Sequence, residues 1–479
     1  MNIKENRKIL ILLVFLIALF MSLIIYLSYF TVFKSAEVIN HPANRREALK
    51  RAKIKRGNIY DRKGELIAYS EGEEYKYTRH YNYPESYSHL VGYSSKVIGN
   101  SGIEASYNKY LLGATQSDVL KSIRAFLDKN YDKDAGDSLY LTTNTSIQEK
   151  ARELLSETGE KGAIVVMNPK TGEVLSMVSY PDFNLETIER DYAAIVERNE
   201  GSFYNSAMQG GFAPGSIQKI VSAAAIIESG VNRSYKDTGE ETAGGYPIKN
   251  AGGKEYGNID LKDAFTYSVN TYFANKSIAI GKEQMGKTAE DFYYNKSIDF
   301  DLNTSNSKLN KSTYNYESWD NQALASASIG QADVSVTPLH MCMVVSAIAN
   351  NGKMMQPYLV SKVVSSDGSD ILTKEPTELV QSVSPEVASE IKDMMIDSVN
   401  RGTGKSARLR SVQVAGKTGT AERSTEKVIN NAWFVGFAPA DDPQIAVAVV
   451  IENVQYLGGE IAAPMAKEIM QFSLEELSR

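Results

Sequence analysis

The sequence has only one cysteine, Cys342, so no intrachain disulfide can form. A lone cysteine can be a catalytic nucleophile, but Cys342 lies in the run Met-Cys-Met-Val-Val, which is typical of a buried core. Only four histidines are present, which leaves few candidates for a Ser-His-Asp triad or a histidine-rich metal site. The net charge of −6 argues against nucleic acid as a partner. Neither a metal nor another cofactor is indicated.

One long apolar run is present, with no second run of comparable length. Ile9 to Phe30 covers 22 residues without a charged side chain. As a helix it reaches about 33 Å, enough to cross a hydrocarbon core of about 30 Å. Three basic residues precede it, which predicts a cytoplasmic N-terminus and an exported remainder. A cleaved signal peptide is the alternative, but no small-x-small site follows the run. We expect residues 1–8 to be a cytoplasmic tail and 9–30 a single membrane-spanning anchor.

Residues 31–143 are polar and rich in tyrosine, and they contain no catalytic constellation. Arg56–Ala68 predicts two strands around a turn at Lys63-Gly64, and Gly99–Leu112 predicts a short helix. We interpret this part as a β-rich spacer or docking module.

The pattern changes near Leu139, and residues 144–479 are expected to form a second domain. Thr145-Ser-Ile-Gln148 resembles a helix-start capping box. Strand-like runs and a last helical run follow: Gly162–Met167, Glu173–Val178, Ala432–Phe437, Gln444–Ile451, and Pro464–Leu477. Asn168–Gly172 has strong turn chemistry, which predicts a hairpin between the first two runs. Strands, then helices, then strands and a final helix predict an α+β domain with one antiparallel sheet.

A serine and a lysine lie three residues apart at the start of a predicted helix. Ala213-Pro-Gly-Ser216 precedes the apolar spacing of Ile217–Glu228, so Ser216 is expected at the helix N-terminus with Lys219 on the same face. A serine hydroxyl needs a base, and Lys219 can act as one only when neutral, about three pKa units below its reference value. The simpler interpretation makes Ser216 a helix cap and Lys219 a surface residue. The Ser-x-x-Lys motif is common, so by itself it does not identify a catalytic site.

Two further motifs follow in the chain. Ser268 and Asn270 stand in Tyr-Ser-Val-Asn, where the serine could relay a proton and the asparagine could hold a substrate amide. Lys417-Thr-Gly-Thr420 starts at the last residue of the run Val412–Lys417, which predicts a strand. Gly419 would let a substrate backbone approach the strand edge closely. Lys417 would add a positive field that holds a carboxylate and lowers a neighbouring lysine pKa. The non-catalytic alternatives are helix capping for Ser268 and Asn270, and a plain turn for Lys417-Thr-Gly419.

Ser-x-x-Lys, Ser-x-Asn and Lys-Thr-Gly occur here in the order found in penicillin-binding proteins and serine β-lactamases. The chain most resembles the class B, monofunctional transpeptidases. The resemblance extends over nearly the whole chain, in these segments: Arg56–Gly64, Gly102-Ile-Glu104, Ile329-Gly-Gln331, Thr337-Pro-Leu339, and Trp433–Phe437. His41–Arg46 resembles the short elongation or division type. This resemblance implies a five-stranded antiparallel sheet flanked by helices, with an N-terminal pedestal or dimerisation-like module.

The resemblance also implies a chemistry. Ser216 would be the acylated nucleophile, Lys219 its base, Ser268 the proton relay and Asn270 an orienting group. The substrate carboxylate would be bound by Lys417 and Thr418, beside Gly419. The N–H groups of Ser216 and Thr420 would form an oxyanion hole. The donor would be a peptidoglycan stem peptide ending in D-Ala-D-Ala, and β-lactams would mimic it. No glycosyltransferase domain fits before residue 139, which implies a separate membrane polymerase partner of the SEDS type.

Three related functions remain as alternatives. A class A β-lactamase needs a glutamate that activates water, and Asp299-Phe-Asp-Leu-Asn303 is only a loose match that has aspartate instead. A β-lactam sensor usually has extra membrane spans and an intracellular output. A D,D-carboxypeptidase would use water as acceptor, and small enzymes of that type generally lack an N-terminal module. The residue after Gly330-Gln331 is Ala332, where many relatives have glycine.

Overall fold

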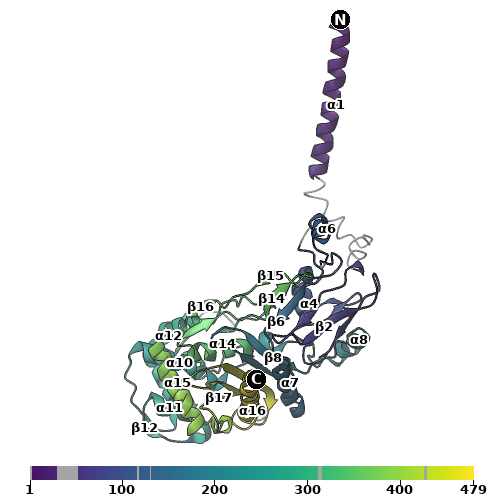
Figure 1. The fold of residues 1–479 in the computed structure, drawn as a ribbon. Helices are drawn as coiled ribbons and strands as arrows, with labels where there is room; N and C mark the ends of the chain where they lie inside the picture. The colour runs from purple at the N-terminus through teal and green to yellow at the C-terminus, as the bar shows by residue number, and fades with distance from the viewer. Residues whose placement is uncertain (1–2, 30–51, 116–117, 130, 311–315, 425–428) are drawn as a thin grey trace. The chain divides into compact units, whose positions relative to one another are not determined.

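The computed structural model describes residues 3–29, 52–115, 118–129, 131–310, 316–424 and 429–479. The chain divides into two units, residues 1–55 with 70–78, and residues 56–69 with 79–479. Helix α1 (Ile3–Tyr29) belongs to the first unit (Figure 1). The side chains of Leu10–Leu27 are exposed, and this segment is long and apolar enough to cross a membrane. The last predicted anchor residue, Phe30, and the His41–Arg46 motif lie outside the described residues.

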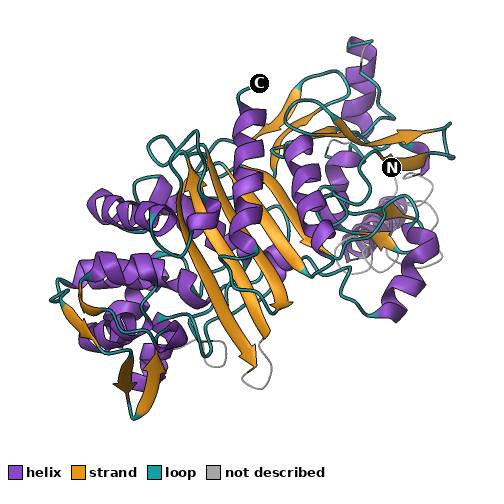
Figure 2. Ribbon diagram, turned by 90° about the horizontal axis from the view of Figure 1, so that it is seen from below, coloured by secondary structure: helices purple, strands orange, loops and turns teal. Residues whose placement is uncertain are grey.

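The second unit is built on the predicted antiparallel sheet, which has five strands in the order β17-β18-β19-β7-β8 (Figure 2). Their bounds are β7 (Gly162–Met167), β8 (Val174–Tyr180), β17 (Ala415–Ser424), β18 (Ile429–Ala438) and β19 (Ile445–Val454). The hairpin at residues 168–172 is confirmed. Strand β17 lies at one edge of the sheet, so one side of its backbone is left for other groups.

Successive residues of the central strands enter two different cores. In β7, Ile164 and Val166 pack with helices α7 (Thr145–Thr158) and α16 (Ala462–Leu477) on one face. Val165 points to the opposite face, which is covered by α14 (Pro338–Ala349). This alternation follows from the two-residue period of a strand, and burial on both faces explains why the strands are almost wholly apolar. Figure 2 shows a helix that ends at the C-terminus crossing the sheet.

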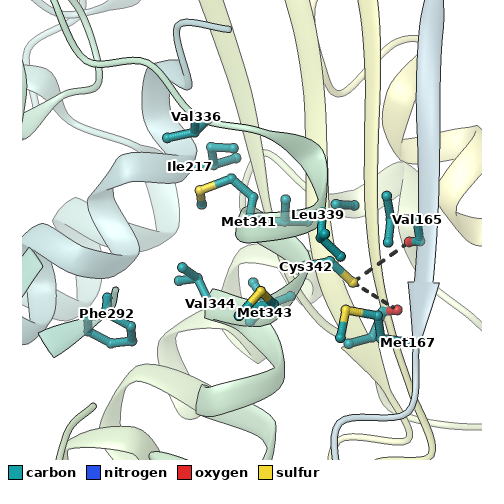
Figure 3. Packing of buried hydrophobic residues seen from close by; sticks show 14 of the residues in the cluster. Val165, Met167, Ile217, Phe292, Val336, Leu339, Met341, Cys342, Met343 and Val344 are labelled. Carbon is teal, nitrogen blue, oxygen red and sulfur yellow. Dashed lines mark hydrogen bonds between the residues drawn. The ribbon is translucent and has the colours of Figure 1, made fainter. Parts of the chain in front are cut away.

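Helix α14 contains Cys342 and is buried all round. Thr337 caps its start by accepting the His340 N–H, and Pro338 occupies the first turn. Figure 3 shows Cys342 among Val165, Met167 and the neighbouring methionines. Burial raises the pKa of its thiol, which favours the unreactive protonated form. The prediction that Cys342 is a core residue is confirmed.

Further helices of the second unit lie outside the two sheets. Their bounds are α8 (Ile188–Arg198), α9 (Ser206–Gln209), η2 (Gly215–Gln218), α10 (Lys219–Ser229), η3 (Ala251–Gly253), α11 (Leu261–Tyr267), α12 (Asn270–Asp291), η4 (Tyr316–Ser318), α13 (Asn321–Ser328), α15 (Pro385–Asn400) and η5 (Lys405–Ala407). Short strands accompany them: β9 (Tyr235–Asp237), β10 (Glu240–Ala243), β11 (Tyr246–Lys249), β12 (Gly257–Ile259), β13 (Lys353–Met355) and β16 (Glu378–Gln381).

A second sheet joins N-terminal strands to strands from the middle of the chain, in the order β15-β14-β6-β1-β2-β3. The bounds are β1 (Ile59–Tyr60), β2 (Leu66–Glu71), β3 (Thr78–Tyr81), β6 (Ser138–Leu141), β14 (Val360–Val364) and β15 (Asp370–Thr373). Nearby lie β4 (Ser94–Ser95), β5 (Gly99–Asn100), α4 (Gly102–Ser106), α5 (Asn108–Leu111) and α6 (Asp118–Leu127). The predicted strand pair within 56–68 and the short helix within 99–112 are confirmed.

A buried ion cluster connects the two N-terminal segments that carry the family resemblance. Glu104 is fully buried and accepts hydrogen bonds from Arg56 and from Arg79 Nε, the latter at 2.7 Å. Arg56 Nη2 also donates to the Glu104 carbonyl oxygen at 2.6 Å. Two guanidinium groups around one carboxylate satisfy a charge that would otherwise be costly to bury. The Arg56 and Gly-Ile-Glu104 motifs therefore form one structural unit.

Two local predictions are wrong. The first residue of the proposed capping box, Thr145, is not the cap: Asn144 accepts the Ile147 N–H at 3.2 Å. Gln148, the other end of the box, reaches the Ser86 and Met177 backbone instead. The strand that carries the Lys-Thr-Gly motif also begins at Ala415 and not at Val412, and it continues beyond the motif to Ser424.

Candidate active site

Ser216 lies where an irregular segment enters a helix. The 3-10 helix η2 contains Ser216 and runs directly into α10, which ends at Ser229 and is capped by Gly230. The predicted helix start is therefore confirmed, although its first turn is 3-10. Ser216 is partly exposed, whereas Ile217 and the apolar face of α10 are buried. The sequence thus anchors the helix in the core and leaves the hydroxyl-bearing turn accessible.

Lys219 begins α10 and is fully buried. Its amine Nζ contacts three oxygens: the Ser268 carbonyl at 2.8 Å, Ser268 Oγ at 3.1 Å and Asn270 Oδ1 at 2.7 Å. The Phe273 ring lies on another side, 5.4 Å from the amine. The first two predicted motifs are therefore joined by direct hydrogen bonds, although 49 residues separate Lys219 from Ser268.

Ser268 owes its position to a break between two helices. It ends α11 in the left-handed region, with φ 60°, and Asn270 begins α12 two residues later. A non-glycine residue in this region costs free energy, and such conformations are found disproportionately at functional sites. Here the turn directs both the carbonyl oxygen and Oγ of Ser268 toward Lys219.

The Lys-Thr-Gly motif supplies the opposite side of the network. Lys417 is fully buried on edge strand β17, and its Nζ lies 3.0 Å from Ser268 Oγ. The Ser268 hydroxyl therefore lies between two lysine amines. Lys417 also donates to the Thr418 carbonyl at 3.1 Å, and the Phe265 ring lies 5.8 Å from its amine. All three motifs meet in this way at one serine.

Two glycines bring β17 against the segment that carries Ser216. A side chain on Gly215 would come within 2.5 Å of the Thr420 carbonyl oxygen, and one on Gly419 within 2.7 Å of the Pro214 carbonyl oxygen. Gly215 also has φ 56°. Only glycine fits such an approach without a backbone shift. The indole of Trp433 donates to the Ala213 carbonyl at 3.1 Å and holds the same segment on β18.

The two amines have depressed pKa values. Burial, and then the positive charge of Lys417, lower the pKa of Lys219 well below its ordinary value. Burial also lowers the pKa of Lys417, to about 7. Within the described residues neither amine is paired with a carboxylate, so no negative charge opposes these shifts. The geometry therefore favours a neutral lysine one turn from a partly exposed serine, which is the state a general base requires.

The remaining motif hydroxyls are held by neighbours that the sequence analysis did not single out. Thr418 Oγ1 lies 2.7 Å from Thr403 Oγ1, and Thr420 Oγ1 accepts the Gly458 N–H at 3.1 Å. Thr403 lies between Gly402 and Gly404. A hydroxyl flanked by glycines is a signal that could have identified it.

The Asp299–Asn303 segment, which the sequence analysis compared with β-lactamases, lies away from this network. Asp301 accepts the Leu359 N–H at 2.6 Å and the Val360 N–H at 3.2 Å, so it anchors the start of β14. Asp299 contacts the Gln356 side chain. The loose β-lactamase match is thus a packing loop. Among the described residues, no group of three or more His, Cys, Asp or Glu side chains is placed to hold a metal ion.

Comparisons with known proteins agree with this geometry. Residues 162–471 match the family model of the penicillin binding protein transpeptidase domain, and residues 56–138 match that of the penicillin binding protein A dimerisation domain. The chain is 29% identical to peptidoglycan D,D-transpeptidase PbpA of Mycolicibacterium smegmatis, over 91% of this chain and 92% of that protein.

Solved structures extend the likeness to the fold. A D,D-transpeptidase domain of a peptidoglycan glycosyltransferase from Eggerthella lenta is 34% identical, with a TM-score of 0.78 over 89% of this chain and 99% of that one. Penicillin-binding protein A from M. tuberculosis, solved as a ceftriaxone acyl-enzyme complex, is 27% identical, with a TM-score of 0.81 over 89% and 100%.

Proposed function

Because this chain belongs to the penicillin-binding protein transpeptidase family, we propose that it is a peptidoglycan D,D-transpeptidase that acts through an acyl-enzyme on Ser216. One observation carries the assignment of the site: Ser268 Oγ lies 3.1 Å from the Lys219 amine and 3.0 Å from the Lys417 amine, and Lys219 directly follows the 3-10 turn that contains Ser216. The relatives named peptidoglycan D,D-transpeptidase support the activity.

In the acylation step, neutral Lys219 accepts the proton of the Ser216 hydroxyl while the oxygen attacks the penultimate D-Ala carbonyl. The depressed pKa of Lys219 supports this role, because a protonated amine cannot accept a proton. The negative oxygen that forms is bound by the backbone N–H groups of Ser216 and Thr420, where loss of one donor typically costs about 100- to 1,000-fold in rate. The close approach of Gly215 to the Thr420 backbone supports this pairing.

Collapse of the intermediate breaks the peptide bond and expels D-Ala. Ser268 relays a proton from Lys219 to the leaving amine, a path supported by its place between the amines. The amine of a second stem peptide then attacks the acyl-enzyme, gives up a proton to the same network and releases the cross-linked product with a free Ser216. Asn270 orients the donor amide, a role that its contact with Lys219 supports.

The donor's terminal carboxylate is bound by the Lys417 ammonium and Thr418, along the edge of β17 at Gly419. The buried positive charge and the edge position of the strand support this assignment. A β-lactam would bind in the same way, because it carries a carboxylate next to a reactive amide. The acyl-enzyme complex solved for penicillin-binding protein A of M. tuberculosis supports acylation of this chain by β-lactams.

Helix α1 is proposed to anchor the enzyme in the cell membrane, with a cytoplasmic N-terminus and an extracellular catalytic domain. We divide the chain into an N-terminal module over 31–143 and a transpeptidase domain over 144–479. The partner is a separate glycan polymerase of the SEDS type, contacted through the anchor and the N-terminal module. If residues 9–30 are exchanged for an unrelated span, co-purification with the polymerase should be lost; unchanged co-purification would contradict the anchor's part in the contact.

The acyl-enzyme is tested with the full chain in detergent and a labelled penicillin. Intact mass and peptide mapping should find one adduct, on Ser216, in the wild type and none in Ser216→Ala. Ser229→Ala is the matched control, because Ser229 lies at the far end of α10, where its hydroxyl donates to the Ile226 carbonyl and accepts the Val231 N–H. An adduct elsewhere, or one that survives in Ser216→Ala, would overturn the assignment.

Product analysis separates the remaining functions. A pentapeptide donor supplied with an amine acceptor should give a cross-linked dimer and free D-Ala. Trimmed monomer alone would indicate a D,D-carboxypeptidase. Stable acylation without turnover of any peptide would indicate a β-lactam sensor, and rapid release of hydrolysed β-lactam would indicate a β-lactamase.

A further inference from the structure

A polar cluster outside the three motifs lies directly behind Asn270. Asp237 at the end of β9, Asn250 after β11 and Thr271 in the first turn of α12 are nearly or fully buried. Asp237 Oδ1 accepts the Thr271 hydroxyl at 2.6 Å, and Asn250 Nδ2 lies 3.0 Å from both Asp237 oxygens. The cluster has no contact with the lysine amines, so it falls outside the proposed chemistry.

The carboxylate of Asp237 is the centre of the cluster, and it acts only as a hydrogen-bond acceptor. Besides the two side chains, it accepts the Gly239 N–H at 3.2 Å and the Tyr256 N–H at 2.7 Å. Burial raises the pKa of Asp237, but the hydrogen bonds from Thr271 and from the backbone outweigh it and hold the pKa below its ordinary value. The ionised carboxylate thus ties three separate segments to the start of α12.

Helix α12 lacks a cap of its own. Val269 occupies the cap position and has no side-chain oxygen to offer. Asn250 supplies the missing acceptor from another segment, because its Oδ1 accepts the Thr271 backbone N–H at 3.2 Å. The position of the first turn of α12, and therefore of Asn270, depends on Asn250 and on the carboxylate that holds it.

The same segment fixes the orientation of the Asn270 amide. Asn270 Nδ2 donates to the Lys249 carbonyl at 2.9 Å, and Lys249 directly precedes Asn250. Asn270 Oδ1 is therefore the atom that faces Lys219 Nζ, at 2.7 Å. A flipped amide would set its carbonyl against the Lys249 carbonyl, so the contact with Lys249 decides the orientation.

We propose that Asp237 and Asn250 are positioning residues: through Thr271 and Lys249 they hold Asn270 with its side-chain oxygen on the Lys219 amine. This inference rests on the proposed function. Displacement of Asn270 would leave the carboxylate-binding strand β17 intact but would misplace the amide-orienting group in the transition state. A displacement of about 1 Å can cost about 100-fold in rate.

The test uses two conservative changes at Thr271 and one at Asp237. Thr271→Val removes the hydroxyl that Asp237 accepts while it keeps the shape and burial of the side chain. Thr271→Ser keeps the hydroxyl and is the rescue control. Asp237→Asn, which sets an amide donor against donors, is the second disruptive variant. For each variant, the acylation rate constant, the non-covalent affinity for a reporter penicillin and the fraction of chains labelled at saturation are measured.

We expect Thr271→Val and Asp237→Asn to lower the acylation rate constant by about 10-fold to 100-fold, with affinity and labelled fraction near wild type. Thr271→Ser should keep the wild-type rate. Wild-type rates in both disruptive variants, a labelled fraction that falls at an unchanged rate constant, or a loss in Thr271→Ser equal to that in Thr271→Val would each overturn the proposal. Failure of the proposed function would instead appear in the wild type, as absence of the Ser216 adduct.

Discussion

The pH dependence of acylation tests the part proposed for Lys417. Its buried amine lies against Ser268 Oγ, and burial lowers its pKa to about 7. In the proposed mechanism the ammonium form binds the donor carboxylate, whereas Lys219 acts in its neutral form. Raising the pH above 7 therefore removes the charge that binds the substrate while it leaves the base active. We expect acylation by a carboxylate-bearing β-lactam to slow as the pH rises.

The magnitude follows from the protonated fraction of Lys417. With a pKa of about 7, that fraction is about one half at pH 7 and about one hundredth at pH 9, so the second-order rate constant should fall about 50-fold. This rate constant reports the groups of the free enzyme, so the bound carboxylate does not mask the titration. Because Lys219 and Lys417 share Ser268 Oγ, the observed midpoint belongs to the pair.

The assay is stopped-flow acylation by a fluorescent penicillin between about pH 6 and pH 9, at constant ionic strength. The matched control is the same compound with its carboxylate esterified, which has no charge for Lys417 to bind. The ester should react more slowly at neutral pH and lose little further rate up to pH 9. Equal losses for the acid and the ester would refute the reasoning, because the titrating group would then act on chemistry and not on carboxylate binding.

Two substitutions probe the backbone around the site. Gly419→Ala would place a methyl group 2.7 Å from the Pro214 carbonyl, so β17 must shift; acylation should fall by up to about 100-fold with little change in thermal midpoint, and a wild-type rate would contradict the close approach. Ala332 has φ 59°, which disfavours any residue except glycine. Ala332→Gly should therefore raise the free energy of unfolding by about 0.5–1 kcal/mol, measured by denaturation, and a destabilised variant would contradict this.

The sequence predicted the elements of the central sheet well, because alternation and turn chemistry are local signals. Gly162–Met167 was predicted to the residue, and its two faces differ in the structure as a two-residue period requires. The six-stranded sheet was harder to predict, because β14 pairs with β6 across more than two hundred residues and no local pattern signals that partner. Gln148 misled for the same reason: its spacing fitted a capping box, but its amide bonds to the Met177 backbone of β8.

The site shows a similar division. The three motifs indicated the candidate residues, and the structure brings the amines of Lys219 and Lys417 to Ser268 and the side chain of Asn270 to Lys219. The residues that hold these side chains in place belong to none of the three motifs. Asn250 caps a helix that begins 20 residues later, and Thr403 meets Thr418 from the loop after α15. Their roles follow from tertiary contacts, which single-residue spacing does not encode.

The energetic cost of the two buried lysines decides between a structural and a functional reason for their burial. A lysine pKa lowered to about 7 implies that folding must offset about 4 kcal/mol at neutral pH, since the unfolded chain keeps its proton up to about pH 10. This cost shrinks as the pH rises from about 7 toward 10, because the unfolded chain then gains less free energy from keeping its lysine protonated. Whole domains are stable by only about 5–15 kcal/mol.

A structural role for this burial would need a compensating partner, such as the carboxylate that Arg56 and Arg79 share at Glu104. Within the described part of the chain, Lys219 and Lys417 donate only to neutral oxygens, and an aromatic ring lies beside each amine. A methionine of similar length would fill the same space without the desolvation cost. The arrangement therefore works against stability. In the proposed mechanism it provides one neutral and one charged amine beside the Ser268 hydroxyl, for proton transfer to and from Ser216.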